Sequence, residues 1–269
     1  MEKTKRNNKP DTAFCVGNVW VGRYFFVIAG PCAVESEHQI VKCAQLAKAQ
    51  GASMLRGGAF KPRTSPYDFQ GLEEEGLRYL QTAKQETNLP IVTEIVDSAH
   101  ISLFEKYDID VYQIGSRNSQ NFKLLEAVGK ANKTVLLKRG MSMTLDEYLN
   151  SAEYFLANGS TNVILCERGI RTVNDKKDCR NTADVGAIVR LRQYTHLPVI
   201  ADPSHATGYS DMVMPVARSY VAAGAQGLIV EMHYDPKNSR CDGTQSVQRI
   251  DNIVRSCSQL YSVINEKVA

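Results

Sequence analysis

The sequence predicts a single (β/α)8 TIM barrel, and three observations predict it. Short apolar, β-branched runs alternate with longer amphipathic segments along nearly the whole chain of 269 residues. Runs that are apolar on both faces, each followed by a helix, are typical of a parallel sheet covered by helices. Eight such units in a chain of roughly 250 residues predict a closed barrel. A doubly wound open sheet is the alternative, but that fold seldom contains eight evenly spaced units.

The first element is a predicted hairpin ahead of the barrel. Residues 1–11 are polar and basic, and we expect them to form a flexible lead-in. Residues 12–24 alternate apolar and polar side chains around Gly17-Asn18, which is a hairpin signal. We expect this hairpin to cap the N-terminal end, or bottom, of the barrel. Residues 12–269 would then form one catalytic domain.

The eight predicted strands are rich in Val, Ile and Leu, and Gly, Pro, Asn or Asp residues lie near their ends. Between them lie amphipathic segments that end near Gly, Asn or Pro, the expected helix stops. The strands are 25–32, 52–60, 90–96, 111–116, 134–140, 162–169, 198–205 and 227–234. The clearest helices are 37–51, 71–87, 145–159, 212–225 and a final helix over 246–267.

Composition excludes several classes of partner. The chain is 43% hydrophobic and 23% charged, which is ordinary for a globular domain. With 32 Lys+Arg against 29 Asp+Glu, the net charge is +3, too weak to indicate nucleic acid or membrane as the main partner. We find no run of about 18 apolar residues that would predict a membrane-spanning helix. The seven cysteines include no CxxC pair, which favours reduced thiols in a cytoplasmic protein.

Charged side chains gather at the C-terminal ends of the predicted strands, where barrels of this kind build their active sites. One group is cationic. Its guanidinium forks suit phosphate and carboxylate, so a strongly anionic ligand is expected if the group faces one cavity. The other reading is that each cation is an independent surface or salt-bridged residue. The group comprises Arg56, Lys61, Arg63, Arg117, Lys138 and Arg168.

A second group offers a thiol, an imidazole and two carboxylates: Cys32, His205, Glu231 and Asp242. This mixed set of donors fits one divalent transition ion, such as Mn, Fe, Co or Zn, better than Mg or Ca. No short ligand spacing announces a metal site, because the four residues follow different strands. A small buried cysteine and a core histidine therefore remain the alternative. Glu94, Gln113, Glu167 and Asp202 also stand at or near strand ends.

These residues carry a family resemblance. The motifs are GPCAVES (30–36), LRGGAFKPRTSPYDFQG (55–71), QIGSRN (113–118), LLKRGM (136–141), ILCERG (164–169), ADPSHATG (201–208), Glu231-x-His233 and CDG (241–243). In this order they resemble 3-deoxy-D-arabino-heptulosonate 7-phosphate (DAHP) synthase, most closely its compact type I-beta branch, over residues 14 to 255. The resemblance implies a (β/α)8 barrel that condenses phosphoenolpyruvate with erythrose 4-phosphate, the entry step of the shikimate pathway.

The resemblance also implies roles, position by position. Cys32, His205, Glu231 and Asp242 match the ligands of one divalent metal, with Mn²⁺ expected first and Fe²⁺, Co²⁺, Zn²⁺ or Cd²⁺ as alternatives. Arg117, Lys138 and Arg168 match phosphoenolpyruvate-binding residues, with Arg56 and Lys61 beside them. The remaining matches are Lys61, Pro62, Arg63, Thr64 and Ser65 for the erythrose 4-phosphate loop and Asp202 near the aldehyde. Substrate contacts are also expected from Gln113 and Glu167, and catalytic proton transfer from Lys138, Lys61, Asp202 and Glu94.

The related family of 3-deoxy-D-manno-octulosonate 8-phosphate synthases, which use arabinose 5-phosphate, is the nearest alternative. The two are separated by KPRTS (61–65), where the relatives carry a KANRS-like loop. A barrel that binds a phosphorylated metabolite without turnover is the alternative from another class. The tract 170–187 looks longer than usual, and Cys241 beside Asp242 departs from the pattern.

Further expectations concern proton affinity and assembly. A lysine among arginines should have a lowered pKa, because neighbouring cations disfavour its charge. Only about 24 residues precede the first barrel strand, so we expect no fused regulatory domain. The family usually forms homodimers or homotetramers, and a separate chorismate mutase or other regulatory partner is left open.

Overall fold

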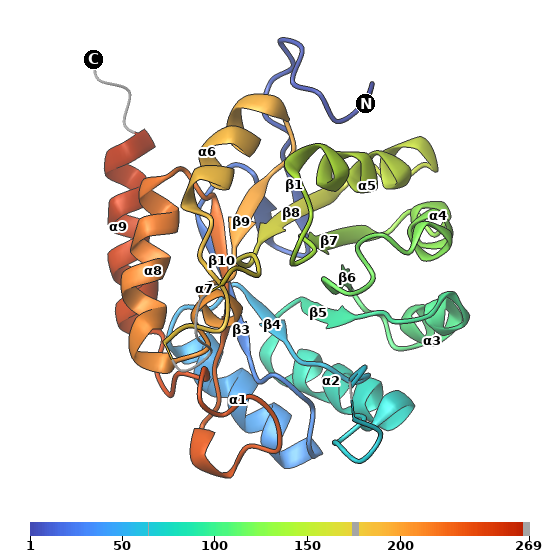
Figure 1. Ribbon diagram of the computed structural model, residues 1–269. Helices are drawn as coiled ribbons and strands as arrows, with labels where there is room; N and C mark the ends of the chain where they lie inside the picture. The colour runs from blue at the N-terminus through green and yellow to red at the C-terminus, as the bar shows by residue number, and fades with distance from the viewer. Residues whose placement is uncertain (64, 174–177, 266–269) are drawn as a thin grey trace.

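The protein is a closed barrel of parallel strands surrounded by helices (Figure 1). The computed structural model describes residues 1–63, 65–173 and 178–265. Around the barrel the strand order is β10-β3-β4-β5-β6-β7-β8-β9, so each strand pairs with its neighbours in sequence and the last pairs with the first. The predicted barrel is confirmed, and an open doubly wound sheet is excluded.

The observed barrel strands lie within the predicted ones but are shorter. They are β3 (Phe26–Gly30), β4 (Met54–Arg56), β5 (Ile91–Glu94), β6 (Val111–Ile114), β7 (Thr134–Lys138), β8 (Val163–Glu167), β9 (Val199–Ala201) and β10 (Gly227–Glu231). The predicted strand 198–205 is wrong at its end, because residues 203–207 form the short helix α7 (Pro203–Thr207). Pro203 suits the first turn of a helix, and the Asp202 side chain accepts a hydrogen bond from the His205 N–H at 3.0 Å.

The outer ring is formed by α1 (Glu37–Ala49), α2 (Glu73–Thr87), α3 (Ile101–Lys106), α4 (Phe122–Lys130), α5 (Leu145–Ala157), α6 (Val185–Tyr194), α8 (Ser210–Ala222) and α9 (Asp251–Asn265). Residues 266–267 of the predicted last helix lie outside the described residues. Several starts are fixed by side-chain caps, for example the reciprocal Thr144–Glu147 capping box of α5. Single 3-10 turns lie at η1 (Ser98–His100) and η2 (Pro236–Asn238).

Strand periodicity explains why polar groups meet inside one end of the barrel. Successive side chains on a strand point to opposite faces. On six strands an apolar residue in the barrel core is followed two positions later by a polar residue nearer the C-terminal end. These pairs are Met54 and Arg56, Val92 and Glu94, Val111 and Gln113, Leu136 and Lys138, Ile200 and Asp202, and Ile229 and Glu231.

The other end of the barrel is closed by the predicted hairpin, which is confirmed. Strands β1 (Phe14–Val16) and β2 (Val19–Val21) pair antiparallel around the turn at Gly17 and Asn18. Phe14, Val16 and Val21 pack in one apolar cluster with the inward-facing strand residues. The hairpin therefore seals the bottom and leaves the polar mouth as the accessible end.

The N-terminal segment differs from the expected flexible lead-in. Residues 2–4 dock on the outside of α5, where their backbone N–H groups all donate to the Glu153 carboxylate at 2.7–2.9 Å. Thr4 is fully buried, and Lys5 forms an isolated β-bridge with Thr195. A carboxylate that collects three N–H donors fixes this segment against the barrel.

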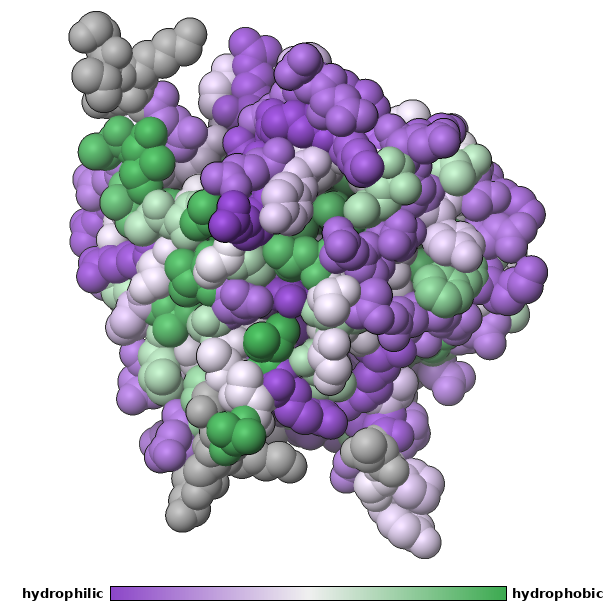
Figure 2. Space-filling view, turned by 45° about the horizontal axis from the view of Figure 1, so that its top comes forward, coloured by the Kyte–Doolittle hydropathy of each residue, from purple (hydrophilic) through white to green (hydrophobic). Residues whose placement is uncertain are grey.

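The surface carries polar side chains over the top and right of the view in Figure 2, with paler and apolar residues gathered to the left. The exposed apolar side chains include Val263 and Ile264 near the end of α9. Among the described residues, no helix combines the length and the apolar character that crossing a membrane requires.

Candidate active site at the barrel mouth

The four predicted metal ligands meet at the mouth of the barrel. Cys32 follows β3, His205 lies on α7, Glu231 ends β10, and Asp242 lies in the loop after it. Two overlapping groups place their donor atoms within 4.8 Å of one another: His205 with Glu231 and Asp242, and Cys32 with Cys241 and Asp242. Cys241 was not among the predicted ligands, although its place beside Asp242 was a signal.

His205 is oriented by Asp202. The imidazole Nδ1 lies 2.7 Å from Asp202 Oδ2, and Nε2 lies 3.3 Å from Glu231 Oε1. Burial lowers the pKa of His205 to about 4, although both carboxylates pull it upward. The imidazole is therefore neutral near pH 7, which is the form that binds metals, and a carboxylate on the far nitrogen is a common support for a metal-binding histidine.

Asp202 also holds Lys138, whose Nζ lies 2.6 Å from Asp202 Oδ2. Both side chains are almost fully buried. Burial raises the pKa of Asp202, but His205 and Lys138 outweigh it and hold that pKa well below its usual range. Asp202 is thus a charged carboxylate that fixes a cation and an imidazole on two different elements.

The acids at the mouth remain charged in the same way. Burial raises the pKa of Glu231, but His205 and Arg56 lower it more, and Arg56 Nη1 lies 3.1 Å from Glu231 Oε1. Gln245 Nε2 donates to the other oxygen of Glu231. Burial also opposes ionisation of Asp242, yet Arg180 and His205 hold its pKa below the usual range.

Two thiols face each other beside these acids. Cys32 Sγ lies 2.8 Å from Cys241 Sγ and 3.2 Å from Asp242 Oδ2. Lys61 Nζ lies 3.0 Å from the Cys32 sulfur. The contact with Cys32 lowers the pKa of Cys241 to about 7 against the effect of burial, with Lys61 contributing. The same contact, together with burial, raises the pKa of Cys32.

The donor set fits a divalent transition ion. Ligands that each lie about 2.0–2.3 Å from one ion are up to about 4.6 Å apart, which matches the spread of these atoms. Glu231 Oε1 is buried and makes no hydrogen bond among the described residues, although Arg56 Nη1 and His205 Nε2 lie 3.1 Å and 3.3 Å away, so this acceptor is not fully satisfied by the protein. Sulfur, nitrogen and carboxylate oxygen together suit Mn, Fe, Co or Zn.

The buried cations point to an anionic ligand. Arg168 is only 5% exposed, and among the described residues its Nη1 has no hydrogen-bond partner. Burial lowers the pKa of Arg168, a sign that the protein only partly compensates its charge. Arg56 Nε is likewise buried without a hydrogen bond. Arg117 lies exposed in the turn after β6.

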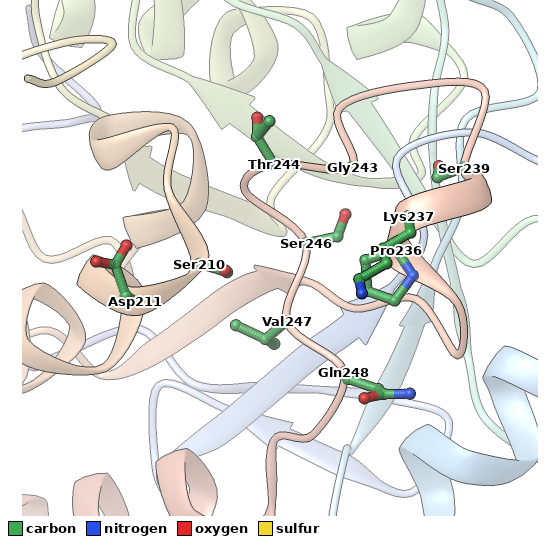
Figure 3. Close-up of a pocket in the computed structure, with 10 residues that line it drawn as sticks. All are labelled: Ser210, Asp211, Pro236, Lys237, Ser239, Gly243, Thr244, Ser246, Val247 and Gln248. Atoms are coloured by element: carbon green, nitrogen blue, oxygen red, sulfur yellow. The ribbon is translucent and has the colours of Figure 1, made fainter. Parts of the chain in front are cut away.

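Arg56, Lys61, Glu94 and Gln113 line one small cavity inside the mouth. A Cβ on Gly115 would overlap the Glu94 carboxylate, so glycine makes room for that side chain. Figure 3 shows a different, more open hollow, where Ser210 and Asp211 lie across from Pro236, Lys237 and Ser239. No predicted site residue lines that hollow. The predicted substrate and metal residues instead gather inside the barrel mouth.

The loop after β4 folds back onto the mouth. Arg63 donates from Nε to the Phe69 carbonyl at 3.1 Å and from Nη2 to Cys241 Sγ at 2.6 Å. Pro62 and Ser65 are half-buried beside it, and Thr64 lies outside the described residues. The expected fall in lysine pKa is wrong for Lys61: burial does lower its pKa, but interaction with the Cys32 and Cys241 sulfurs raises it more.

Glu167, which was expected to contact substrate, is paired within the protein in this structure. Its carboxylate accepts from Arg139 Nη1 at 2.8 Å and from the Gly169 N–H at 2.6 Å. Arg139 also binds Asp184 and the Met143 carbonyl. Glu167 and Arg139 each follow an outward-facing leucine by two positions, so strand periodicity turns them away from the barrel interior. Glu167 therefore fixes the loop that carries Arg168.

Sequence reasoning missed three further residues of the mouth. Arg139 was overlooked because it adjoins Lys138. The two-residue period of a strand nevertheless predicts that these neighbours point to opposite faces of the barrel wall. Gln245 and Arg180 form a brace in which Arg180 Nη1 donates to Gln245 Oε1 at 2.6 Å and lies 3.3 Å from Asp242. The loop positions of Gln245 and Arg180 follow no strand periodicity, and no sequence pattern indicated this pair.

Comparisons with known proteins agree with this geometry. The family model described as the DAHP synthetase I family matches residues 13–262. A phospho-2-dehydro-3-deoxyheptonate aldolase of Thermotoga maritima is 44% identical over 96% of this chain and 76% of that protein. A 2-dehydro-3-deoxyphosphooctonate aldolase of Arabidopsis thaliana is 30% identical over 92% of this chain and 91% of its own length.

Solved structures of DAHP synthases are also similar to this chain. The crystal structure of the Thermotoga maritima DAHP synthase has a TM-score of 0.89 at 42% identity, over 97% of this chain and 76% of that one. A truncated form of the Thermotoga enzyme has a TM-score of 0.88 at 39% identity and is covered over 96% of its length. The chain therefore belongs to the DAHP synthetase I family.

Proposed function

We propose that this mouth condenses phosphoenolpyruvate with erythrose 4-phosphate and water to give DAHP and phosphate, the first step of the shikimate pathway. The observation that carries the proposal is that buried, incompletely hydrogen-bonded guanidinium groups accompany two overlapping groups of candidate metal ligands. A guanidinium as buried as that of Arg168 is costly unless a ligand supplies the missing negative charge. Family membership indicates which anion that is.

Phosphoenolpyruvate is held by Arg117, Lys138 and Arg168, with Arg56 and Lys61 beside them. Because Asp202 fixes Lys138, and the Glu167–Arg139 pair fixes the loop of Arg168, these cations are positioned before substrate arrives. A preset array can hold the methylene carbon towards the aldehyde. Orientation of this kind contributes several kcal/mol towards a barrier, up to about 7–11 in the best intramolecular cases.

Erythrose 4-phosphate is read by the loop from Lys61 to Ser65. Arg63 offers a guanidinium fork at the rim, and Pro62 restricts the backbone next to it. Of this loop, Thr64 lies outside the described residues, so its part rests on the resemblance alone. Asp202 would lie near the aldehyde end of the sugar.

Cys32, His205, Glu231 and Asp242 are proposed to hold one divalent ion, Mn²⁺ first and Fe²⁺, Co²⁺, Zn²⁺ or Cd²⁺ as alternatives. When bound, the ion supplies Lewis-acid polarisation of the aldehyde carbonyl. The protein holds the side chains of the proposed ligands in position. Asp202 orients His205, and Arg56 with Gln245 holds Glu231.

In the reaction a bond forms between the methylene carbon of phosphoenolpyruvate and the aldehyde carbon. Water adds to the central carbon, and phosphate leaves with cleavage of its carbon–oxygen bond. Lys61 is the proposed proton donor to the new hydroxyl oxygen, which its raised pKa supports because its neighbours keep it protonated, and Lys138 is the alternative donor. Glu94 and Asp202 are the acids available to accept a proton from water.

The role of Lys61 has its own test. Lys61→Met should lower kcat by about 10²- to 10⁴-fold, the usual contribution of a general acid. Binding of phosphoenolpyruvate, followed by calorimetry, should weaken far less. Lys123→Met on the exposed face of α4 is the matched control. An unchanged kcat in Lys61→Met would transfer the proton step to Lys138.

The proposed function itself is tested by offering phosphoenolpyruvate with erythrose 4-phosphate and, separately, with arabinose 5-phosphate, and measuring phosphate release and the sugar acid formed. The proposal expects turnover with the four-carbon sugar. Turnover with the five-carbon sugar alone would assign the chain to octulosonate synthesis, and no turnover with either would favour a binding barrel. A homodimer or homotetramer, a separate chorismate mutase or regulatory partner and a cytoplasmic location stay predictions.

A further inference from the structure

We propose that Cys241 is a second sulfur donor of the metal centre, in addition to the four residues matched to the family. Its Sγ lies 2.8 Å from Cys32 Sγ, and it shares a candidate ligand group with Cys32 and Asp242. All donor atoms of that group lie within 4.8 Å of one another. The inference rests on the proposed metal site, and its test separates the failure of either one.

The two cysteines are held together from both loops. Glu35, three residues after Cys32, accepts the Ser239 hydroxyl and the Arg240 N–H, each at 2.9 Å. Cys241 and Cys32 are 4% and 1% exposed. Because a tether joins the loop after β3 to the loop after β10, the sulfurs do not meet by the chance position of one side chain.

The surroundings of the pair suit charged sulfur. Arg63 Nη2 lies 2.6 Å from Cys241 Sγ, and Lys61 Nζ lies 3.0 Å from Cys32 Sγ. A cysteine buried as a small apolar group needs no cation, whereas thiolates are found beside lysine and arginine. Each sulfur thus has its own positive neighbour, which offsets the added negative charge of a second thiolate ligand.

A second thiolate changes which metal the site prefers. Soft sulfur ligands favour Zn²⁺ and other thiophilic ions, while oxygen-rich sites suit Mn²⁺ better. The inferred centre would therefore bind Zn²⁺ or Cd²⁺ more strongly relative to Mn²⁺ than a one-thiolate site would. Arg63 would also connect metal choice to the aldose loop, because it contacts Cys241 from that loop.

The competing explanation of the pair is a disulfide. A disulfide needs an S–S separation of about 2.03–2.05 Å, shorter than the observed contact. Bridging would also remove Cys32 from the proposed ligands. A phosphine reductant separates the two explanations, because it keeps both cysteines as thiols and leaves them free to bind a metal. It also forms no mixed disulfide and supplies no competing thiol.

The test uses Co²⁺ bound to the reduced, full-length protein. Thiolate ligands give Co²⁺ a charge-transfer absorption in the near ultraviolet whose intensity rises with the number of sulfurs. At one Co²⁺ per chain, checked by elemental analysis, Cys241→Ser should lose about half of this absorption. Cys179→Ser, which changes a half-buried cysteine outside the candidate groups, should keep all of it.

Competition between metals gives the second readout. Cys241→Ser should lower the affinity for Zn²⁺ relative to Mn²⁺ by at least about tenfold. Loss of a residue that only hydrogen-bonds a metal ligand already costs about that much affinity, and loss of a ligand should cost no less. Full absorption in Cys241→Ser with loss in Cys32→Ser would overturn the inference and leave the proposed metal site standing. Absence of the absorption in the wild-type protein would overturn the inference as well, because it would remove both Cys241 and Cys32 from the proposed ligands.

Discussion

The buried pair of Glu167 and Arg139 gives the sharpest single test of how the mouth is built. Both side chains are almost fully buried, and Glu167→Gln removes the negative charge while keeping the shape. Removing one partner of a buried pair costs about 3–5 kcal/mol. Arg139 keeps Asp184 at 2.8 Å and the Met143 carbonyl, so we expect the lower end, about 3 kcal/mol.

For a chain of this size, that loss corresponds to a fall in Tm of about 6–12 °C. Thermal unfolding followed by circular dichroism measures it, with kcat/KM for phosphoenolpyruvate measured on the same samples well below Tm. Glu126→Gln, which breaks an exposed pair with Lys130 on α4, should leave Tm unchanged. A Glu167→Gln protein that keeps its Tm but loses most of its kcat/KM would show that Glu167 acts on substrate and not on the stability of the mouth.

Three further outcomes are expected. Arg168→Met should raise KM for phosphoenolpyruvate by about 10- to 100-fold through loss of charged hydrogen bonds, whereas Arg171→Met on the exposed loop should not; equal kinetics would contradict the anion site. Burial raises the pKa of Glu153, but the N–H groups of the N-terminal segment lower it to about 2, below the ordinary 4.5. The wild type should therefore lose stability as pH falls from about 4.5 to about 2, and Glu153→Gln should lack that slope; parallel profiles of Tm against pH would count against it. Tyr148→Phe leaves the Cys166 N–H without the hydroxyl it donates to at 2.7 Å, and we expect a loss of about 1–3 kcal/mol in urea unfolding; an unchanged midpoint would show that the hydroxyl is dispensable.

Much of the fold could be predicted because its signals are local. Eight apolar runs with helical segments between them require a covered parallel sheet, and Gly17-Asn18 requires a tight turn. The strand lengths could not be predicted, since apolar residues continue past the last ladder hydrogen bond into the loops. The short helix α7 was missed although Asp202 and Pro203, a capping residue followed by a proline, mark its start directly after the apolar run.

Convergence of the candidate site residues was predictable where strand periodicity applies. Lys138 and Asp202 stand two positions beyond an inward-facing apolar residue, so their meeting follows from the barrel itself. The pairing of Glu167 with Arg139 follows from the same period, because each side chain stands two positions beyond an outward-facing leucine. The contact of Cys241 with Cys32 joins residues 209 positions apart through two loops, and no local pattern predicts such a contact.

The docking of residues 2–4 on Glu153 was missed for a related reason. A short polar segment with few apolar residues is typical of disorder. Here its order comes from N–H donors that meet one distant carboxylate, and the sequence contains no local signal for that meeting.

The central claim is that the four donors at the barrel mouth hold an ion on which the condensation depends. The most direct measurement is DAHP formation from phosphoenolpyruvate and erythrose 4-phosphate by chelator-treated protein, before and after addition of Mn²⁺, with Asp242→Asn in parallel. Chelation should abolish turnover, Mn²⁺ should restore it in the wild type, and Asp242→Asn should need far more Mn²⁺ or fail. Full turnover by protein shown to be metal-free would contradict the central claim.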